Sequence, residues 1–551
     1  MKQILFFGLL VFSFVGNAYC QNEKIFTHDD TLRGSITPQR AWWDLTFYDL
    51  KINVDLKNKT ISGSNTVKYT VLDKNKNNEL QIDLQEPMIF EKAEQNGRVL
   101  EFYKAGKNAY FIKTGAFKKV GEHQSVTVYY SGKPKTAVNA PWDGGFSWKT
   151  DAQQKPFVAT SCQGLGASVW WPCKDSQYDE PDSMHITVTI PDTLTEVSNG
   201  RLAAETNNND GTKTFEWHVT EPINNYGVNL NIADYAHFSD IYAGEKGNLT
   251  LNYYVLKENE TKAREQFKQV PQMLKAFEYW FGPYPFYEDG YKLVEVPYLG
   301  MEHQSSVTYG NHYENGYLGR DLSGTGWGLK WDFIIVHESG HEWFGNNITS
   351  KDIADMWLHE GFTAYSESLF TEFYYGKQAG AEYVIGTRKS VENDKPIIGH
   401  YNVNNEGSTD MYYKGANMLH TIRQIVNNDA LWRSILRGLN KNFYHQTVTT
   451  AQIESYISEK SEKKLNKIFD QYLRTIQIPV LKYQIAHNHL QYRWANCTEG
   501  FDMPVKVFFD KNTSPTWLHP TTVWQKMKTG AKELIVDKDF FVEKLIVTGI
   551  K

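Results

Sequence analysis

Two histidines one helical turn apart, His337 and His341, do most to constrain how this chain of 551 residues can fold. They lie in residues 331–344, a segment with apolar residues at helical spacing. Positions i and i+4 share one face of a helix, so both imidazoles can reach the same point. Glu360 follows after an intervening stretch of 18 residues, enough for a loop and the start of a second helix. The spacing therefore predicts two helices packed side by side, with Glu360 returning to the two histidines.

Two histidines and one glutamate form a ligand set that zinc uses in hydrolases, with one coordination position left for water. Glu338 follows the first histidine and can lie beside the ion without binding it, where a carboxylate can take a proton from water. Glu367 lies two helical turns after Glu360 and is a candidate hydrogen-bond partner for a ligand imidazole. The residues predict one Zn²⁺ per chain and a hydrolytic reaction. The ordinary alternative is a helix that happens to carry two surface histidines.

The hydrophobic pattern divides the chain into three parts after a leader. Short alternating strands dominate residues 21–238, and we expect an all-β domain there. Residues 239–479 show mainly helical spacing, and residues 480–551 return to short strands. The clearest predicted strands are 48–56, 125–130, 185–190, 227–232, 291–297, 480–485, 505–509 and 533–536. The predicted helices are 259–281, 328–346, 357–375, 412–428 and 450–474.

Residues 1–20 have the pattern of a cleaved secretory signal peptide. Lys2 supplies the positive start, 4–15 is an apolar run, and Ala18 and Cys20 suit the two small-residue positions before the cut. The run is too short for a comfortable membrane span, and no second run approaches the roughly 20 residues that a span needs. We expect a secreted or periplasmic protein. The alternative is a lipoprotein acylated on Cys20, although Tyr19 is bulky for such a site.

Composition excludes some functions. The net charge of −6 gives no reason to expect nucleic acid as a partner. After removal of the leader, three cysteines remain, namely Cys162, Cys173 and Cys497, which is too few for a disulfide scaffold. Cys162 and Cys173 could pair in an oxidising compartment or could be two buried thiols.

Several motifs around the histidines resemble those of a known family. His337-Glu338-Ser339-Gly340-His341 with Glu360 resembles the gluzincin metallopeptidases, and the flanking elements are similar to those of the M1 aminopeptidase family. The elements are Trp343-Phe344-Gly345-Asn346, then Trp357-Leu358-His359-Glu360-Gly361-Phe362 with His359 in place of Asn, and Tyr412-Tyr413-Lys414-Gly415-Ala416. The resemblance implies an α+β multidomain fold: a saddle-like all-β N-terminal domain and a thermolysin-like, mainly α catalytic domain. The strands after residue 480 predict a small C-terminal β-sandwich module and no large C-terminal helical domain.

Two further motifs concern the substrate. Leu299-Gly300-Met301-Glu302-His303 resembles the family's Gly-x-Met-Glu-Asn motif, with Leu299 in place of Gly and His303 in place of Asn. Cys162-Gln163-Gly164-Leu165, followed by Trp171-Pro172-Cys173-Lys174-Asp175, resembles the family's segment around Pro-Cys-x-Asp, without the usual upstream Arg. The resemblance implies that Glu302 and Gln163 hold the substrate's α-ammonium and that Gly300 and Met301 lie along the peptide. It also implies that Tyr412 donates a hydrogen bond to the oxyanion.

Together these residues predict a zinc aminopeptidase acting on peptides with a free N-terminus. An internal segment has no ammonium and would leave Glu302 buried and unpaired, which disfavours binding. Three alternatives remain: a zinc endopeptidase of the thermolysin type, an epoxide hydrolase on the same site, and a non-catalytic scaffold of the same fold.

Overall fold

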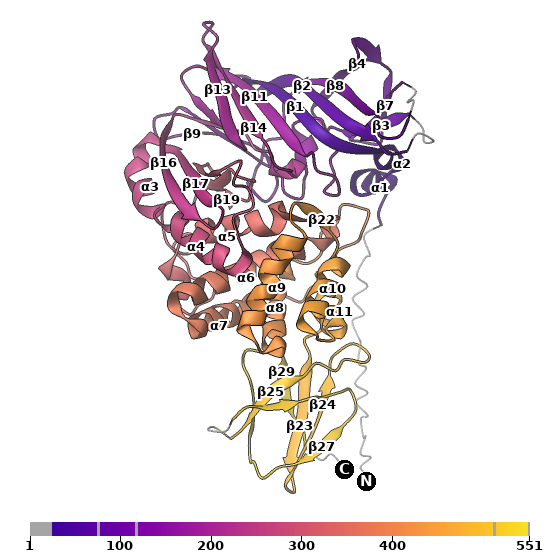
Figure 1. Cartoon of the computed structure of the whole chain (residues 1–551), viewed down its shortest axis with the longest axis vertical. Coiled ribbons are helices and arrows are strands. Elements are labelled where there is room, and N and C mark those ends of the chain that lie inside the picture. The colour runs from indigo at the N-terminus through magenta and orange to yellow at the C-terminus, as the bar shows by residue number, and fades with distance from the viewer. Residues whose placement is uncertain (1–24, 74–77, 116–118, 511–513, 549–551) are drawn as a thin grey trace, which may run out of the picture.

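The structure is a computed structural model that describes residues 25–73, 78–115, 119–510 and 514–548. Three parts follow one another along the long axis of the molecule (Figure 1). A β-rich part lies at one end, helices fill the middle, and a small β part lies at the other end. The predicted signal peptide lies outside the described residues. Among those residues, no helix is both long enough and apolar enough to cross a membrane.

The β-rich part begins with two short helices, α1 (His28–Gly34) and α2 (Pro38–Ala41). Its largest sheet has the order β13-β14-β11-β1-β2-β8-β4-β5. The strands are β1 (Trp43–Asp55), β2 (Thr60–Val71), β4 (Ile89–Gln95), β5 (Arg98–Leu100), β8 (His123–Gly132), β11 (Ser183–Pro191), β13 (Arg201–Asn207) and β14 (Thr212–Val219). In the second half of β1, buried and exposed residues alternate as the sequence predicted, so one face of the sheet covers the core.

Two smaller sheets complete this part. One has the order β12-β15-β10-β9 and the other β3-β7-β6. Their strands are β3 (Glu79–Asp83), β6 (Phe102–Ala105), β7 (Ala109–Lys113), β9 (Gly145–Thr150), β10 (Pro156–Ser161), β12 (Thr195–Val197) and β15 (Asn231–Ala233). The predicted strand 227–232 is mostly wrong. Asn224 caps a short 3₁₀ turn over Asn225–Gly227. The start of the predicted strand belongs to this turn, and β15 begins only at Asn231.

The helical part starts with a five-stranded sheet of order β16-β17-β18-β20-β19. These strands are β16 (Tyr235–Gly244), β17 (Gly247–Leu256), β18 (Tyr291–Glu295), β19 (Gly300–Met301) and β20 (Val307–Tyr309). The helices are α3 (Glu260–Gln266), α4 (Gln269–Phe281), α5 (Phe333–Gly340), α6 (Trp357–Tyr375), α7 (Lys377–Gly386), α8 (Tyr413–Val426), α9 (Asp429–Asn442), α10 (Thr450–Ser461) and α11 (Asn466–Arg474). Two short strands, β21 (Ile348–Ser350) and β22 (Gln446–Val448), pair in parallel and join the segment after α5 to the segment after α9.

Helix bounds follow local signals. Helix α6 has the predicted bounds, and Gly376 ends it with φ +94°, a conformation that glycine adopts freely. The predicted helix 259–281 is instead α3 and α4, broken at Phe267 and Lys268. The predicted helix 450–474 is α10 and α11, broken where Glu462 takes a left-handed conformation. Helices α7 and α9 were not predicted.

The C-terminal part contains two sheets, as a small sandwich requires. Their orders are β27-β24-β23-β29 and β26-β25-β28. The strands are β23 (Val480–Ala486), β24 (His489–Ala495), β25 (Val505–Phe509), β26 (Thr516–Leu518), β27 (Gln525–Lys528), β28 (Leu534–Val536) and β29 (Glu543–Ile546). The core between these sheets, with Leu481, Trp494 and Val505, is continuous with the core of the helical part. The sandwich therefore packs against the helices through a shared hydrophobic core.

Candidate metal centre and substrate cleft

Helix α5 presents His337 and His341 on one face, as their spacing predicted. Asp332 begins the helix, because its side chain accepts hydrogen bonds from the backbone of Ile334 and Ile335. The helix is buried on all sides, and His341 stands at its C-terminal end. The imidazole ring centroids are 5.1 Å apart.

Helix α6 brings Glu360 to the two histidines. Oε2 of Glu360 lies 3.7 Å from Nε2 of His337 and 3.4 Å from Nε2 of His341. This oxygen is buried and has no hydrogen-bond partner among the described residues. The three candidate ligand atoms all lie within 4.8 Å of one another. An unpaired buried carboxylate oxygen facing two imidazole nitrogens fits a tetrahedral zinc site with one open position.

The second nitrogen of each candidate ligand ring, Nδ1, also has a hydrogen-bond partner. Nδ1 of His337 lies 2.7 Å from Oε1 of Glu367, whose other oxygen accepts a hydrogen bond from Tyr383. Nδ1 of His341 lies 3.1 Å from the backbone oxygen of Phe344. Such partners fix the ring tautomer and leave Nε2 of each ring free for a metal.

Negative charge dominates the centre. Burial is the main cause that raises the pKa of Glu302 to about 7. His341 opposes it, whereas the nearby carboxylates of Glu360 and Glu338 act in the same direction as burial. Burial also raises the pKa of Glu338. Burial acts against the charged form of His341, but Glu360 and Glu302 outweigh it and raise its pKa to about 8. A divalent cation would balance this excess of carboxylates.

The cleft beside the ligands has a volume of about 350 Å³. Gln163 reaches into it from the β-rich part, and its Nε2 donates to Oε1 of Glu302 at 2.6 Å and to Oε1 of Glu360 at 2.7 Å. Other predicted site residues also line it, namely Gly300, Met301, His337, Glu338, His341 and Tyr412. Glu367 lies behind His337 instead of in the cleft.

Glycines allow the close packing that forms this cleft. A Cβ on Gly300 would meet Cγ2 of Ile334 at 2.7 Å, so β19 could not lie so close to α5 with any other residue. A Cβ on Gly415 would lie 3.1 Å from Cα of Gly361, where α8 crosses α6. This contact brings Tyr412, at the start of α8, to the metal ligands: its ring centroid is 6.0 Å from that of His337.

The two histidines that replace asparagines in the motifs are both buried. Nε2 of His359 accepts a hydrogen bond from the backbone of Ser350 at 2.8 Å. Nε2 of His303 has no partner among the described residues, and its Nδ1 lies 3.4 Å from the hydroxyl of Thr308. Burial lowers the pKa of each ring to about 3, so both are neutral. Each therefore serves as an uncharged packing and hydrogen-bonding group.

Several residues around the site were not predicted. Glu406 lines the cleft, and Tyr226 places its hydroxyl 3.4 Å from Nδ1 of His359. Arg33 contacts Asp175 across 142 positions of sequence. The sequence carries no periodic pattern that would reveal contacts between residues so far apart. Cys162 and Cys173 are both buried as free thiols, which leaves the disulfide alternative unsupported.

The fold and the arrangement of His337, His341 and Glu360 are together those of the gluzincin class. The Peptidase family M1 domain matches residues 265–472, and the Peptidase M1 N-terminal domain matches residues 45–226. The chain belongs to peptidase family M1.

Known proteins agree with this assignment. The chain is 23% identical over 475 residues to aminopeptidase N of Lactobacillus helveticus, covering 81% of this chain and 52% of that protein. It is 24% identical over 315 residues to endoplasmic reticulum aminopeptidase 1 of Mus musculus, covering 54% of this chain and 33% of that protein. The chain thus spans between about a third and a half of the length of these relatives. An M1 zinc metallopeptidase from Deinococcus radiodurans, solved as a mutant with a Tyr-Ser-Ala substrate, shares the fold with a TM-score of 0.63 and 20% identity, covering 79% of this chain and 95% of that one.

Proposed function

We propose that this protein is a zinc-dependent aminopeptidase that removes the N-terminal residue of peptides. The observation that carries the proposal is the position of Glu302. Its carboxylate lies within 4.8 Å of the nearest ligand atoms of Glu338 and His341, and Gln163 donates to it. One residue of extended peptide spans about 3.3–3.6 Å, so an ammonium held at Glu302 places the first peptide bond beside the metal ligands.

His337, His341 and Glu360 would hold the zinc ion. When bound, zinc lowers the pKa of water and polarises the scissile carbonyl. The carboxylate of Glu338 accepts the proton of the attacking water and then delivers it to the leaving amine. The hydroxyl of Tyr412 donates a hydrogen bond to the oxyanion that develops in the tetrahedral intermediate, a contribution of about 3 kcal/mol.

The charge of Glu302 favours substrates with a free amine. This carboxylate is buried and poorly solvated, which is the main reason that its pKa is raised to about 7, so its charged form gains from an ammonium partner. A peptide with a blocked N-terminus supplies no positive charge and leaves the carboxylate buried and unpaired. The same argument disfavours the endopeptidase alternative.

The test is a panel of aminoacyl-coumarin substrates with matched N-acetylated controls, assayed with and without a chelator. We expect hydrolysis of the free-amine substrates only, and its loss with the chelator. Equal turnover of acetylated substrates would favour an endopeptidase, and no turnover by zinc-loaded protein would favour a scaffold. Glu302→Ala should lower kcat/KM for aminoacyl substrates, by about tenfold or more if a buried ion pair is lost. An unchanged kcat/KM would remove Glu302 from amine binding.

Secretion remains a proposal that rests on the sequence of residues 1–20. N-terminal sequencing of the mature protein from its natural source should begin at Gln21. An intact leader would contradict export by this route, and an acylated Cys20 would support the lipoprotein alternative.

A further inference from the structure

Gln163, the residue of the β-rich part that we propose binds the substrate amine, lies on a tight turn. The backbone of Gly166 donates to the oxygen of Cys162 at 2.7 Å, and that of Leu165 donates to the oxygen of Gln163 at 2.7 Å. Gly164 and Gly166 have φ values of +70° and +92°, which favour glycine. The direction of the Gln163 side chain therefore depends on where this turn is held.

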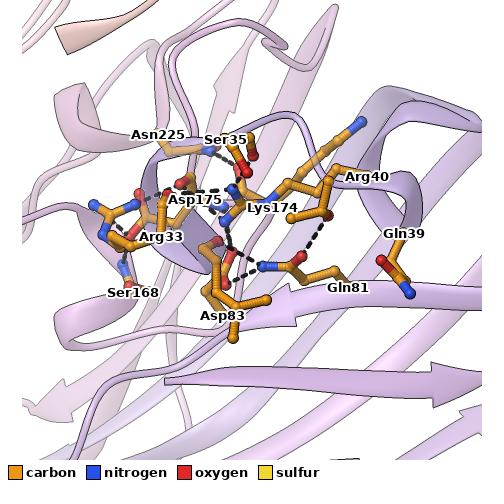
Figure 2. Close-up of polar contacts among 12 residues, drawn as sticks. Arg33, Ser35, Gln39, Arg40, Gln81, Asp83, Ser168, Lys174, Asp175 and Asn225 are labelled. Atoms are coloured by element: carbon orange, nitrogen blue, oxygen red, sulfur yellow. Dashed lines mark hydrogen bonds and ion pairs between the residues drawn. The ribbon is translucent and has the colours of Figure 1, made fainter. Parts of the chain in front are cut away.

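Arg33, on α1, holds this turn in place through its guanidinium. One guanidinium nitrogen donates to the backbone oxygen of Leu165 at 3.1 Å and lies 3.2 Å from Oδ2 of Asp175. The other nitrogen donates to the backbone oxygen of Asp175 at 2.5 Å. Asp175 in turn accepts from the backbone of Ser168 at 3.0 Å. Figure 2 shows Arg33, Asp175 and Ser168 in this arrangement.

The fit between arginine and turn is close. A Cβ on Gly166 would lie 2.0 Å from Nη2 of Arg33 and 2.4 Å from Oδ2 of Asp175. Only glycine at this position lets the guanidinium reach the Leu165 oxygen. Gln85 donates to the same oxygen at 2.8 Å, so two side chains fix this one carbonyl.

Arg33 is itself fixed by a buried network. Arg40 has no exposed surface and donates to the backbone oxygens of Arg33 at 3.2 Å and Ser35 at 2.9 Å. Its guanidinium also pairs with Asp83 at 2.5 Å, as Figure 2 shows. Gln81 links this carboxylate to the backbone oxygen of Leu32. The position of α1 is thereby tied to the sheet beneath the turn.

We propose that Arg33 is a positioning residue for substrate amine binding and that it acts through the 162–166 turn on Gln163. Arg33 lies outside both segments that match the M1 family, so this support comes from a part of the chain that the family assignment does not cover. The amide of Gln163 must meet Glu302 and Glu360 at once, at 2.6 and 2.7 Å. A displacement of the turn by about 1 Å breaks one of these contacts, and such misplacements are large effects in active sites. The inference rests on the proposed aminopeptidase activity.

The test is a double-mutant cycle of Arg33→Ala and Gln163→Ala in the zinc-loaded full chain, with KM and kcat measured on an aminoacyl-coumarin substrate. We expect Arg33→Ala to raise KM by about tenfold, with kcat within about threefold of the wild type, because a ground-state amine contact is lost. In the Gln163→Ala background, Arg33→Ala should alter KM by less than about twofold, because the two substitutions remove the same contact with the substrate amine. Arg33→Lys keeps the charge but not the forked geometry, so it should restore KM only in part.

A purely structural role predicts a different result. A partly unfolded population lowers apparent kcat and leaves KM unchanged, and its effect multiplies with that of Gln163→Ala. Either result would overturn the inference. The exposed Arg264 pairs with Glu260 on α3, so Arg264→Ala is the matched control and should leave both constants unchanged. If Arg33→Ala yields no folded protein, Gln85→Ala takes its place in the cycle with the same expectations.

The possible failures are distinguishable. If the wild type does not cleave free-amine substrates, the proposed function fails. If Gln163→Ala leaves KM unchanged, the role of Gln163 in amine binding fails, and the inference with it. If Gln163→Ala raises KM and Arg33→Ala acts independently of it, only the role of Arg33 fails. Calorimetric titration of a dipeptide amide into Glu338→Gln protein should reproduce the same non-additivity in Kd.

Discussion

Nδ1 of His337 lies 2.7 Å from Oε1 of Glu367, so the imidazole is held from behind and turns Nε2 toward Glu360. Both partners are buried, and Tyr383 donates to the second oxygen of the same carboxylate at 2.8 Å. This chain of contacts joins α5, α6 and α7 behind the metal ligands. It makes the orientation of His337, a candidate zinc ligand, depend on Glu367 and Tyr383, which do not line the cleft.

Replacing Glu367 should weaken zinc binding. Glu367→Gln removes the negative charge that orients and polarises the His337 ring, and we expect the zinc dissociation constant to rise by about 10- to 100-fold. Competition with a fluorescent chelator measures this directly. Tyr383→Phe keeps the carboxylate and should have a smaller effect. An equal or larger effect of Tyr383→Phe would contradict this order of contributions.

Glu338 should be needed for turnover and dispensable for metal binding. It lines the cleft, and one of its carboxylate oxygens lies within 4.8 Å of a ring nitrogen of His341. Glu338→Gln keeps the size of the side chain and removes the base, so kcat should fall by about 10² or more while zinc content stays near that of the wild type. Steady-state kinetics and metal analysis of the same preparation check both parts. Near-normal turnover would refute the role of Glu338 as base.

Tyr412 should stabilise the transition state. Burial and the nearby carboxylates of Glu360 and Glu302 raise the pKa of Tyr412 well above its usual value, so the hydroxyl keeps its proton for donation. Tyr412→Phe should lower kcat by about 10² or more with little change in KM. The neighbouring Tyr413 also lines the cleft. A larger loss in Tyr413→Phe would assign the donor role to that hydroxyl instead.

Acid should destabilise the protein through His303. Burial lowers its pKa in the folded state to about 3, whereas an unfolded histidine titrates near 6.5. The folded state therefore binds fewer protons than the unfolded state between these values. Stability is fully present above pH 6.5 and is lost as pH falls toward 3.

His303→Asn removes this titration. Between pH 7.5 and 5 the free energy of unfolding of the wild type should fall by about 2 kcal/mol more than that of His303→Asn. Denaturant titrations of both proteins at each pH, with the same excess of zinc, measure the difference. Parallel pH dependences would show that His303 does not carry this term.

The sequence was most informative where a local rule applies. Helical spacing predicted that His337 and His341 share a face and that residues 357–375, which form α6, are a helix. It was least informative where two distant segments meet. The contact of Arg33 with Asp175 and that of Tyr383 with Glu367 depend on how whole elements pack, and neither partner has a local signature. The break between α3 and α4 was missed because Phe267 continues the apolar pattern across it.

The measurement that tests the central claim most directly is the zinc content of the purified wild type and of His341→Ala, determined by elemental analysis beside activity. The wild type should contain about one zinc ion per chain, as a three-ligand catalytic site holds. It should lose activity on full chelation and regain it when zinc is returned. His341→Ala should lose both the metal and the activity. Full activity in metal-free wild type, or a full complement of zinc in His341→Ala, would contradict a catalytic zinc ion on His337, His341 and Glu360.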